Sequence, residues 1–119
     1  MGNLYRFTEP VLLLLLKMKG RSYGYDLAAA LHDYALTDAE IERGALYRTL
    51  RQLEKNGNVT SEWETTDSGP ARRVYQLTPE GEKHLEEWTA VLEHVSKSMA
   101  RFVRTVKSLE AKAAGSRRA

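Results

Sequence analysis

Hydrophobic and polar residues recur along the chain with periods that predict four helices and one β-hairpin. The first helix is expected over residues 8–19, where the apolar run Val11–Leu16 follows Pro10 and precedes Gly20. Proline favours the first turn of a helix, and glycine favours its C-terminal cap. Because the apolar run leaves no polar face, we expect this helix to be buried on most sides.

A second helix is expected to start within Ser22–Asp26. Its apolar residues recur at spacings of three and four, which is the repeat of one helix face. This face should pack against the first helix, and it consists of Leu27, Ala28, Leu31 and Tyr34.

A third helix is predicted to end at Asn56–Gly57, a pair typical of a left-handed C-cap. Thr37–Glu40 matches a capping box, so the helix should begin there or shortly after. Gly44 complicates that start, because glycine costs about 1 kcal/mol relative to alanine inside a helix. It marks either a break at residues 42–44 or a close approach to DNA or to a neighbouring helix. The expected buried stripe is Ile41, Leu46, Leu50 and Leu53.

Two strand-like runs, Val59–Glu64 and Arg72–Leu77, are rich in β-branched and aromatic residues. Residues 65–71 between them are dense in turn formers, so we predict one antiparallel hairpin. Since two strands alone are marginally stable in water, one side of the hairpin must pack against helices. The candidates for that side are Val59, Trp63, Tyr75 and Leu77.

The last helix is predicted to begin with Thr78 as its N-cap and Pro79 at its first position. Its apolar residues alternate at spacings of three and four, the pattern of a coiled-coil seam. About 30 such residues would be roughly 45 Å long, and their seam needs a partner, most simply the same helix of a second copy. The expected dimer interface is Leu85, Trp88, Leu92, Val95, Met99, Phe102, Val106 and Leu109.

The predicted fold is therefore mainly α with a small β-hairpin: a winged helix-turn-helix followed by a long C-terminal dimerisation helix. Arg43, Arg48 and Arg51 of the third helix precede its first acidic residue, Glu54, and Arg72 and Arg73 lie at the hairpin tip, so positive charge gathers at two places that a winged helix presents to phosphates. We therefore expect a DNA-binding winged helix-turn-helix domain over residues 1–78, the dimerisation helix over 79–112 and a disordered basic tail over 113–119. A chain of 119 residues has room for one hydrophobic core.

Composition narrows the class of protein. A hydrophobic content of 42% with 29% charged residues excludes a wholly disordered chain. The absence of cysteine excludes disulfides and thiolate metal sites, and it suits a cytoplasmic protein. Val11–Leu16 is far shorter than the roughly 20 residues that cross a membrane, and no cleavage site follows it. We therefore expect no membrane segment and no signal peptide.

The formal net charge of +2 hides an uneven distribution. Residues 1–42 carry four basic and six acidic side chains, 43–79 carry six and four, 80–95 one and five, and 96–119 seven and one. So small a total cannot steer the whole protein to DNA, which leaves local patches to do so. The basic C-terminal segment could contact nucleic acid, or it could be a solvated helix face with a frayed end.

Residues for catalysis or metal binding do not come together in the sequence. His84 with Glu80 or Glu87 could be drawn as a metal cluster, but charge on a helix surface explains these residues better. There is no Ser-His-Asp order, glycine-rich phosphate loop or paired carboxylate. We therefore expect no enzymatic activity, no metal and no cofactor.

Five short motifs occur in order along the chain: Gly24–Leu27, Gly44–Tyr47, Leu50–Glu54, Gly69–Tyr75 and Leu77–Gly81. Together they resemble the PadR family of bacterial transcriptional regulators, over residues 8–110. The resemblance implies a winged helix-turn-helix homodimer, usually a repressor, that is joined by its C-terminal helices and often released by a small molecule. Members usually carry proline or a small polar residue in place of Arg43, and proline in place of Arg48.

The expected DNA contacts lie on the third helix and the hairpin. Tyr47 matches the family tyrosine that contacts the DNA backbone, although it could also be a core residue. Arg48 and Arg51 share one helix face and could pair with a guanine edge or with phosphates. Arg72 and Arg73 could enter a minor groove, clamp the flanking backbone or simply be solvated. With Tyr23, whose alternative is a core or capping role, the expected set is Tyr23, Arg43, Tyr47, Arg48, Arg51, Arg72 and Arg73.

Trp88 and Leu92 are candidate contacts for a small aromatic effector, because a seam seldom carries so large a ring unless it fills a space between helices. Flat aromatic ligands stack in the dimer cleft of some family members, while ordinary packing is the alternative. The predicted function is a sequence-specific homodimeric repressor that binds double-stranded DNA at an inverted-repeat operator. The rival interpretations are a winged-helix protein-interaction module without a specific DNA target and a protein that sequesters drugs.

Overall fold

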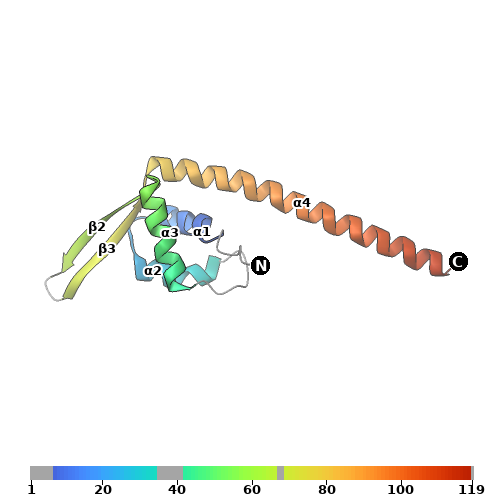
Figure 1. Ribbon diagram of the computed structural model, residues 1–119, viewed down its shortest axis with the longest axis horizontal. Coiled ribbons are helices and arrows are strands. Elements are labelled where there is room, and N and C mark those ends of the chain that lie inside the picture. The colour runs from blue at the N-terminus through green and yellow to red at the C-terminus, as the bar shows by residue number, and fades with distance from the viewer. Residues whose placement is uncertain (1–6, 35–41, 67–68, 119) are drawn as a thin grey trace. The chain divides into compact units, whose positions relative to one another are not determined.

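The structure is a computed structural model that describes residues 7–34, 42–66 and 69–118 (Figure 1). It divides into two compact units, Met1–Glu86 and Glu87–Ala119. The predicted fold class is confirmed, because helices dominate, a small antiparallel sheet forms the wing and a long C-terminal helix follows. The elements are α1 (Thr8–Lys19), β1 (Ser22–Tyr23), α2 (Gly24–Leu31), the 3-10 helix η2 (His32–Tyr34), α3 (Arg43–Lys55), β2 (Val59–Thr66), β3 (Gly69–Leu77) and α4 (Pro79–Arg118).

Helix α1 forms the centre of the core of the first unit. It has the predicted bounds and ends at Gly20, whose φ of +74° is one that glycine adopts readily. Five of the six residues of Val11–Leu16 are buried, and the helix contacts α2, α3 and β3. The apolar run is thus covered on most sides, as its lack of a polar face predicts.

Helix α2 begins at Gly24 and buries Leu27 and Leu31, two of the four apolar residues expected to face α1. Ala28 is partly exposed. Tyr34 is exposed, contrary to the prediction, because it falls in η2 after the α-helix has ended. A 3-10 turn has a different period, so its side chains leave the face that α2 presents.

Helix α3 separates apolar and charged side chains cleanly. Leu46, Leu50 and Leu53 are buried, as predicted, and Gly57 ends the helix with a φ of +82°. Gly44 lies in the first turn of α3, so the full cost of a glycine in a helix interior does not arise there. The capping box at residues 37–40 and Ile41 lie outside the described residues.

The hairpin of β2 and β3 is confirmed, and β1 adds a third strand, which gives the antiparallel order β1-β3-β2. Ser22 pairs with Tyr75, and Tyr23 pairs with Val74. The central strand β3 is therefore covered on both faces near its end, where the adjacent residues Val74 and Tyr75 are each 5% exposed.

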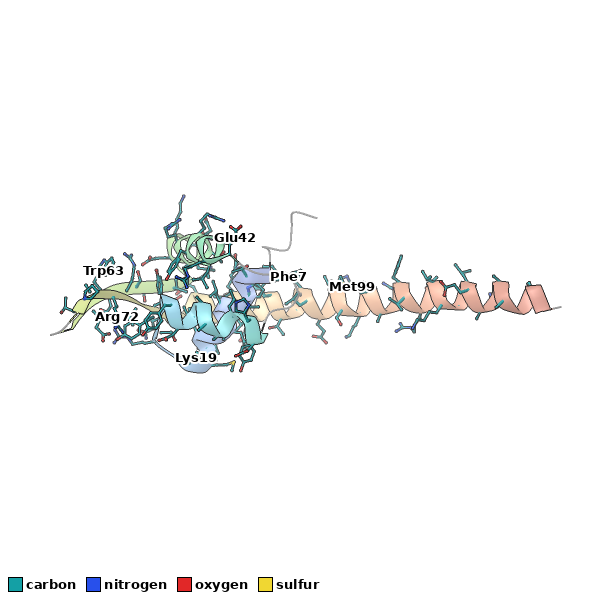
Figure 2. All side chains as sticks on the ribbon, turned by 90° about the horizontal axis from the view of Figure 1, so that it is seen from below. Phe7, Lys19, Glu42, Trp63, Arg72 and Met99 are labelled. Carbon is teal, nitrogen blue, oxygen red and sulfur yellow. The ribbon has the colours of Figure 1, made fainter. Side chains whose placement is uncertain are left out.

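The alternation along β2 predicted that Trp63 would pack in the core, and this prediction is wrong. Val59 is buried, Leu77 is partly buried, and Trp63 is 63% exposed. Alternation predicts which face of a strand a residue occupies, but it does not predict how far along the strand the covering helices reach. Trp63 lies four residues beyond Val59, in the half of the hairpin that projects past them (Figure 2).

The start of α4 is fixed to the rest of the first unit. The Thr78 hydroxyl accepts a hydrogen bond of 3.0 Å from the Gly81 amide, the N-cap contact that the sequence predicts. A Cβ at residue 81 would lie 2.0 Å from the Asn58 carbonyl oxygen, so only glycine fits there. Lys17 of α1 pairs with Glu82 at 2.7 Å. The first compact unit therefore includes the first turns of α4, up to Glu86.

In the second unit, α4 continues to Arg118, six residues past the predicted end at residue 112. Alanine and arginine are strong helix formers, and they fill four of the six positions of this stretch, beside Ser116 and the unfavourable Gly115. Large apolar side chains remain exposed along the seam, notably Met99, Phe102 and Leu109. Across the described residues, no helix combines the length and apolar character needed to span a membrane.

Candidate nucleic-acid interface

The exposed side of α3 is basic. Arg43, Arg48, Arg51 and Lys55 are exposed on this helix, whose only acidic residue is Glu54. The three buried leucines hold the opposite side of α3 against the core, and α1 contacts the helix. Apolar packing therefore fixes the helix and directs its cations outward.

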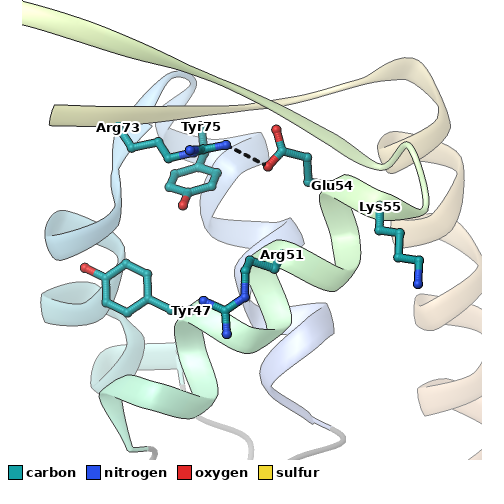
Figure 3. A pocket seen from close by; sticks show the side chains of 6 residues that line it. All are labelled: Tyr47, Arg51, Glu54, Lys55, Arg73 and Tyr75. Atoms are coloured by element: carbon teal, nitrogen blue, oxygen red, sulfur yellow. Dashed lines mark hydrogen bonds and ion pairs between the residues drawn. The ribbon is translucent and has the colours of Figure 1, made fainter. Parts of the chain in front are cut away.

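An open cleft of about 440 Å³ separates α3 from β3 (Figure 3). Its walls carry three cationic side chains and one carboxylate, so the cleft has a surplus of positive charge. Such a space suits an anion of the size of a phosphate group. The residues of this α3–β3 cleft are Tyr47, Arg51, Glu54, Lys55, Arg73 and Tyr75.

Glu54 ties the hairpin to α3 across this cleft. One of its oxygens lies 3.3 Å from Arg73 Nη2, and the other accepts a hydrogen bond of 2.5 Å from the Ser61 hydroxyl. Arg73 Nε also donates to Ser61 Oγ at 2.9 Å. The Arg73 guanidinium lies over the Trp63 ring, 5.3 Å from its centroid. Wing and helix are thus held in one arrangement by a connected polar network.

Tyr47 occupies its place because residue 24 has no side chain. A Cβ at Gly24 would come within 2.8 Å of the Tyr47 ring, so glycine lets the ring pack at the start of α2. Across the cleft, burial raises the pKa of the Tyr75 hydroxyl above its ordinary value. Both tyrosines line the cleft with rings that are packed against the protein, Tyr47 beside Gly24 and Tyr75 at 5% exposure.

On the other face of the sheet, the polar and aromatic side chains bind one another. We call it the tyrosine face, formed by Glu62, Glu64, Arg72, Tyr23 and Tyr25. The two tyrosine rings stack with centroids 6.0 Å apart, and the Arg72 guanidinium lies 5.6 Å from each. Arg72 donates to the Tyr25 hydroxyl at 3.1 Å, and Tyr23 donates to Glu64 at 2.7 Å. The hydrogen bond to Glu64 raises the pKa of Tyr23.

The residues that we expected to contact DNA fall into two groups on different faces of the structure. Arg43, Tyr47, Arg48 and Arg51 share α3, and Arg73 joins Tyr47 and Arg51 across the cleft. Arg43 lies at the start of the helix, where it lines a separate hollow with residues of α2. Arg72 lies on the tyrosine face with Tyr23, whereas its neighbour Arg73 lines the cleft. Neighbouring residues of a strand point to opposite faces, so the period of two, applied to β3, could have separated the two arginines.

Sequence reasoning missed Glu54, Lys55 and Tyr75 as cleft residues, and it missed Ser61 as the hydrogen-bond partner of Glu54. Lys55 could have been found from its spacing, since it lies four residues after Arg51 on the same helix face. Glu54 and Ser61 are brought together by the tertiary fold, and no local pattern reports that. Trp88 and Leu92 lie on the part of α4 in the second unit, where both are partly buried.

Comparison with known proteins agrees with this geometry. Residues 11–87 match the family described as the Transcriptional regulator PadR-like family. The transcriptional regulator Rv3488 of Mycobacterium tuberculosis is 41% identical over 59 residues, which are 50% of this chain and 54% of that protein. The match therefore spans about half the length of this curated relative.

Two solved structures extend the similarity to most of the chain. A transcriptional regulator from Clostridium thermocellum superimposes with a TM-score of 0.74 and 28% identity, covering 87% of this chain and 97% of that one. A PadR family transcriptional regulator from Eggerthella lenta gives a TM-score of 0.65 and 31% identity, covering 78% and 80%. With a family match over well more than half of its residues, the chain belongs to the PadR-like family of transcriptional regulators.

Proposed function

We propose that the protein is a cytoplasmic, sequence-specific DNA-binding regulator that represses transcription as a homodimer. The observation that carries the proposal is the basic exposed side of α3, which continues into the positively charged α3–β3 cleft. A winged helix-turn-helix presents its recognition helix to the major groove in this way. Its surplus cations replace counterions of the DNA phosphates, which supplies much of the affinity.

In this proposal α3 enters the major groove and the cleft holds one strand of the DNA backbone. Arg48 and Arg51 contact guanine edges or phosphates, and Arg43 contacts a phosphate at the start of the helix. The Tyr47 hydroxyl and Arg73 complete the phosphate contacts from the two walls of the cleft. Arg72 and Tyr23 stay outside this surface, because both are engaged on the tyrosine face.

The exposed seam of α4 supports pairing of two copies. Phe102 is 70% exposed and Met99 61% exposed, and side chains of this kind are normally covered by a partner helix in a coiled coil. Residues 1–78 would then read DNA and residues 79–112 would join the copies. A symmetric pair places the two α3 helices in successive major grooves, with half-sites about 34 Å apart on an inverted repeat.

A small aromatic effector is proposed to stack on Trp88 beside Leu92, between the α4 helices of the two copies. Both side chains lie on the seam, where an aromatic ring between helices offers a flat apolar surface. Release from DNA requires that the ligand bind one geometry of the dimer better than the other. The effector would therefore act by changing the spacing of the two recognition helices.

The test is a fluorescence-anisotropy titration of the protein against a labelled duplex of its own promoter and a shuffled duplex of equal length, at two salt concentrations. The proposal predicts tight binding to the promoter alone, with two chains per site. Equal and salt-sensitive binding to both duplexes would reject the sequence-specific function. Sedimentation equilibrium of the protein alone should report a stable dimer, and a monomer would favour the protein-interaction module.

A further inference from the structure

Trp63 is the most exposed of the large hydrophobic side chains described in the first unit. At 63% exposure it exceeds Met18 and Tyr25, each at 52%, and Tyr34 at 39%. An indole has a large apolar surface that normally contributes to a core or an interface. Its exposure on a projecting hairpin therefore indicates a surface that a partner covers.

The ring is held in a defined position although it is exposed. It pairs across the strands with Arg73, whose guanidinium lies 5.3 Å from the ring centroid. Arg73 is in turn bound to Ser61 and to Glu54 of α3. Trp63 is thus connected to the proposed recognition helix through two side chains. As the cross-strand partner of the cleft residue Arg73, it lies on the same face of the hairpin as the cleft.

Its surroundings select the kind of partner. The ring sits beside the cationic Arg73, with the polar Ser61 two residues earlier on the same face of β2, and the cleft next to it adds Arg51 and Lys55. A lipid surface or an apolar protein groove binds an apolar patch that is larger than a single ring, so neither fits Trp63. A sugar–phosphate backbone offers apolar deoxyribose faces between charged phosphates, which suits one aromatic ring among cations.

We propose that Trp63 is a DNA-contact residue of the wing. Its ring packs against deoxyribose of the backbone strand held in the α3–β3 cleft, while Arg73 behind it faces the adjacent phosphate. The indole N–H is then free to donate to a phosphate oxygen. This inference rests on the proposed DNA-binding function, and it adds a contact that charge alone does not provide.

Tryptophan fluorescence during a titration with unlabelled promoter duplex tests the contact. The wild-type protein should change its emission on binding, whereas Trp63→Phe, which retains Trp88 as an internal reference, should bind without that change. In anisotropy titrations, Trp63→Phe should stay within about threefold of wild type. Trp63→Ala should lose about tenfold in affinity, in keeping with an aromatic contact. Because no charge is removed, the loss should be the same at both salt concentrations.

The matched control is Gln76→Ala, an exposed change on the other face of the same hairpin, which should keep wild-type affinity. An emission change that persists in Trp63→Phe would assign the signal to Trp88 and overturn the contact. Wild-type affinity in Trp63→Ala would overturn it as well. If the wild-type protein binds neither promoter nor shuffled duplex, the DNA-binding function itself fails, which the anisotropy titration reports separately.

Discussion

The two faces of the wing carry similar kinds of side chain, but they differ in how many of their cations are paired within the protein. On the tyrosine face Arg72 lies against the two stacked tyrosine rings, and Arg21 pairs with Glu62 at 2.5 Å. On the cleft face Arg73 shares the single carboxylate of Glu54 with Ser61, while Arg51 and Lys55 form no ion pair with any described residue. The first face uses its charges to hold the sheet together, and the second keeps cations available for an anion.

This difference matters because exposed ion pairs add little stability, about 0–1 kcal/mol each. The tyrosine face therefore gains mainly fixed geometry from its pairs, and the cleft loses little stability by leaving cations unpaired. Positive charge without an internal partner is what DNA phosphates can neutralise. Under the proposed function, the operator is therefore expected at the cleft face of the wing, and the following changes test that expectation.

The largest effect is expected from replacing Arg48 and Arg51 by alanine together. Operator affinity should fall about a hundredfold, because each arginine contributes either a base contact or a phosphate contact. The salt slope should flatten by about 0.9 for every phosphate contact removed. The matched control, the double change to lysine, keeps the charge and loses only bidentate contacts. Unchanged affinity and slope in the alanine variant would remove these residues from the interface.

Gly24→Ala should disturb the cleft through Tyr47. The new methyl group would lie 2.8 Å from the Tyr47 ring, so the ring or α2 must move, at a cost of about 1–3 kcal/mol in the free energy of unfolding. Urea denaturation measures that cost, and anisotropy should show weaker operator binding. Gly115→Ala is the control, since no atom lies within 4 Å of its new methyl group. A variant as stable and as active as wild type would show that Tyr47 does not depend on Gly24.

Single replacements of the neighbouring arginines should have different consequences. Arg73→Ala should weaken operator binding about fivefold and reduce the salt slope by about 0.9, the value for one phosphate contact. Arg72→Ala should leave binding within twofold and lower the free energy of unfolding by about 0.5–1 kcal/mol, because it loses its contacts with two tyrosine rings. Anisotropy and urea denaturation of both variants measure the two effects. The reverse pattern would move the DNA to the tyrosine face.

The smallest effect concerns pH. The hydrogen bond to Glu64 raises the pKa of Tyr23, so the folded chain holds this proton more tightly than the unfolded chain, in which the pKa is about 10. The stability from this bond is present below the unfolded value and is lost as pH rises through the higher folded value. The free energy of unfolding should therefore decrease less steeply from about pH 9 to pH 11 in Tyr23→Phe than in the wild-type protein. Identical curves for the two proteins would contradict this role of the hydroxyl.

Much of the fold could be predicted because it follows local rules. Gly20 and Gly57 end α1 and α3 with positive φ angles, and Thr78 caps α4, as their positions in the sequence indicate. The leucine spacing of α3 identifies its buried side, and its arginines are exposed by the same period. In each case the information lies within one or two turns of the residue concerned.

The rest depends on contacts between distant segments. The two-residue strand β1 exists through its pairing with β3, some 50 residues later, and no local signal marks it. The exposure of Trp63 depends on where the helices stop covering the hairpin, and the ion pair of Glu54 with Arg73 depends on how α3 meets the wing. The candidate site was therefore predictable as a set of arginines but not as a cleft with two walls.

The most direct measurement compares the salt dependence of operator binding in two variants that each remove two positive charges. Arg51→Ala/Arg73→Ala removes two of the three cations of the cleft, and Arg21→Ala/Arg72→Ala removes two cations from the tyrosine face. If the cleft holds the DNA backbone, the first variant should lose up to about 1.8 in the salt slope, and the second should keep the wild-type slope. Equal slopes in the two variants, or a loss confined to the second, would contradict the assignment of the operator to the cleft.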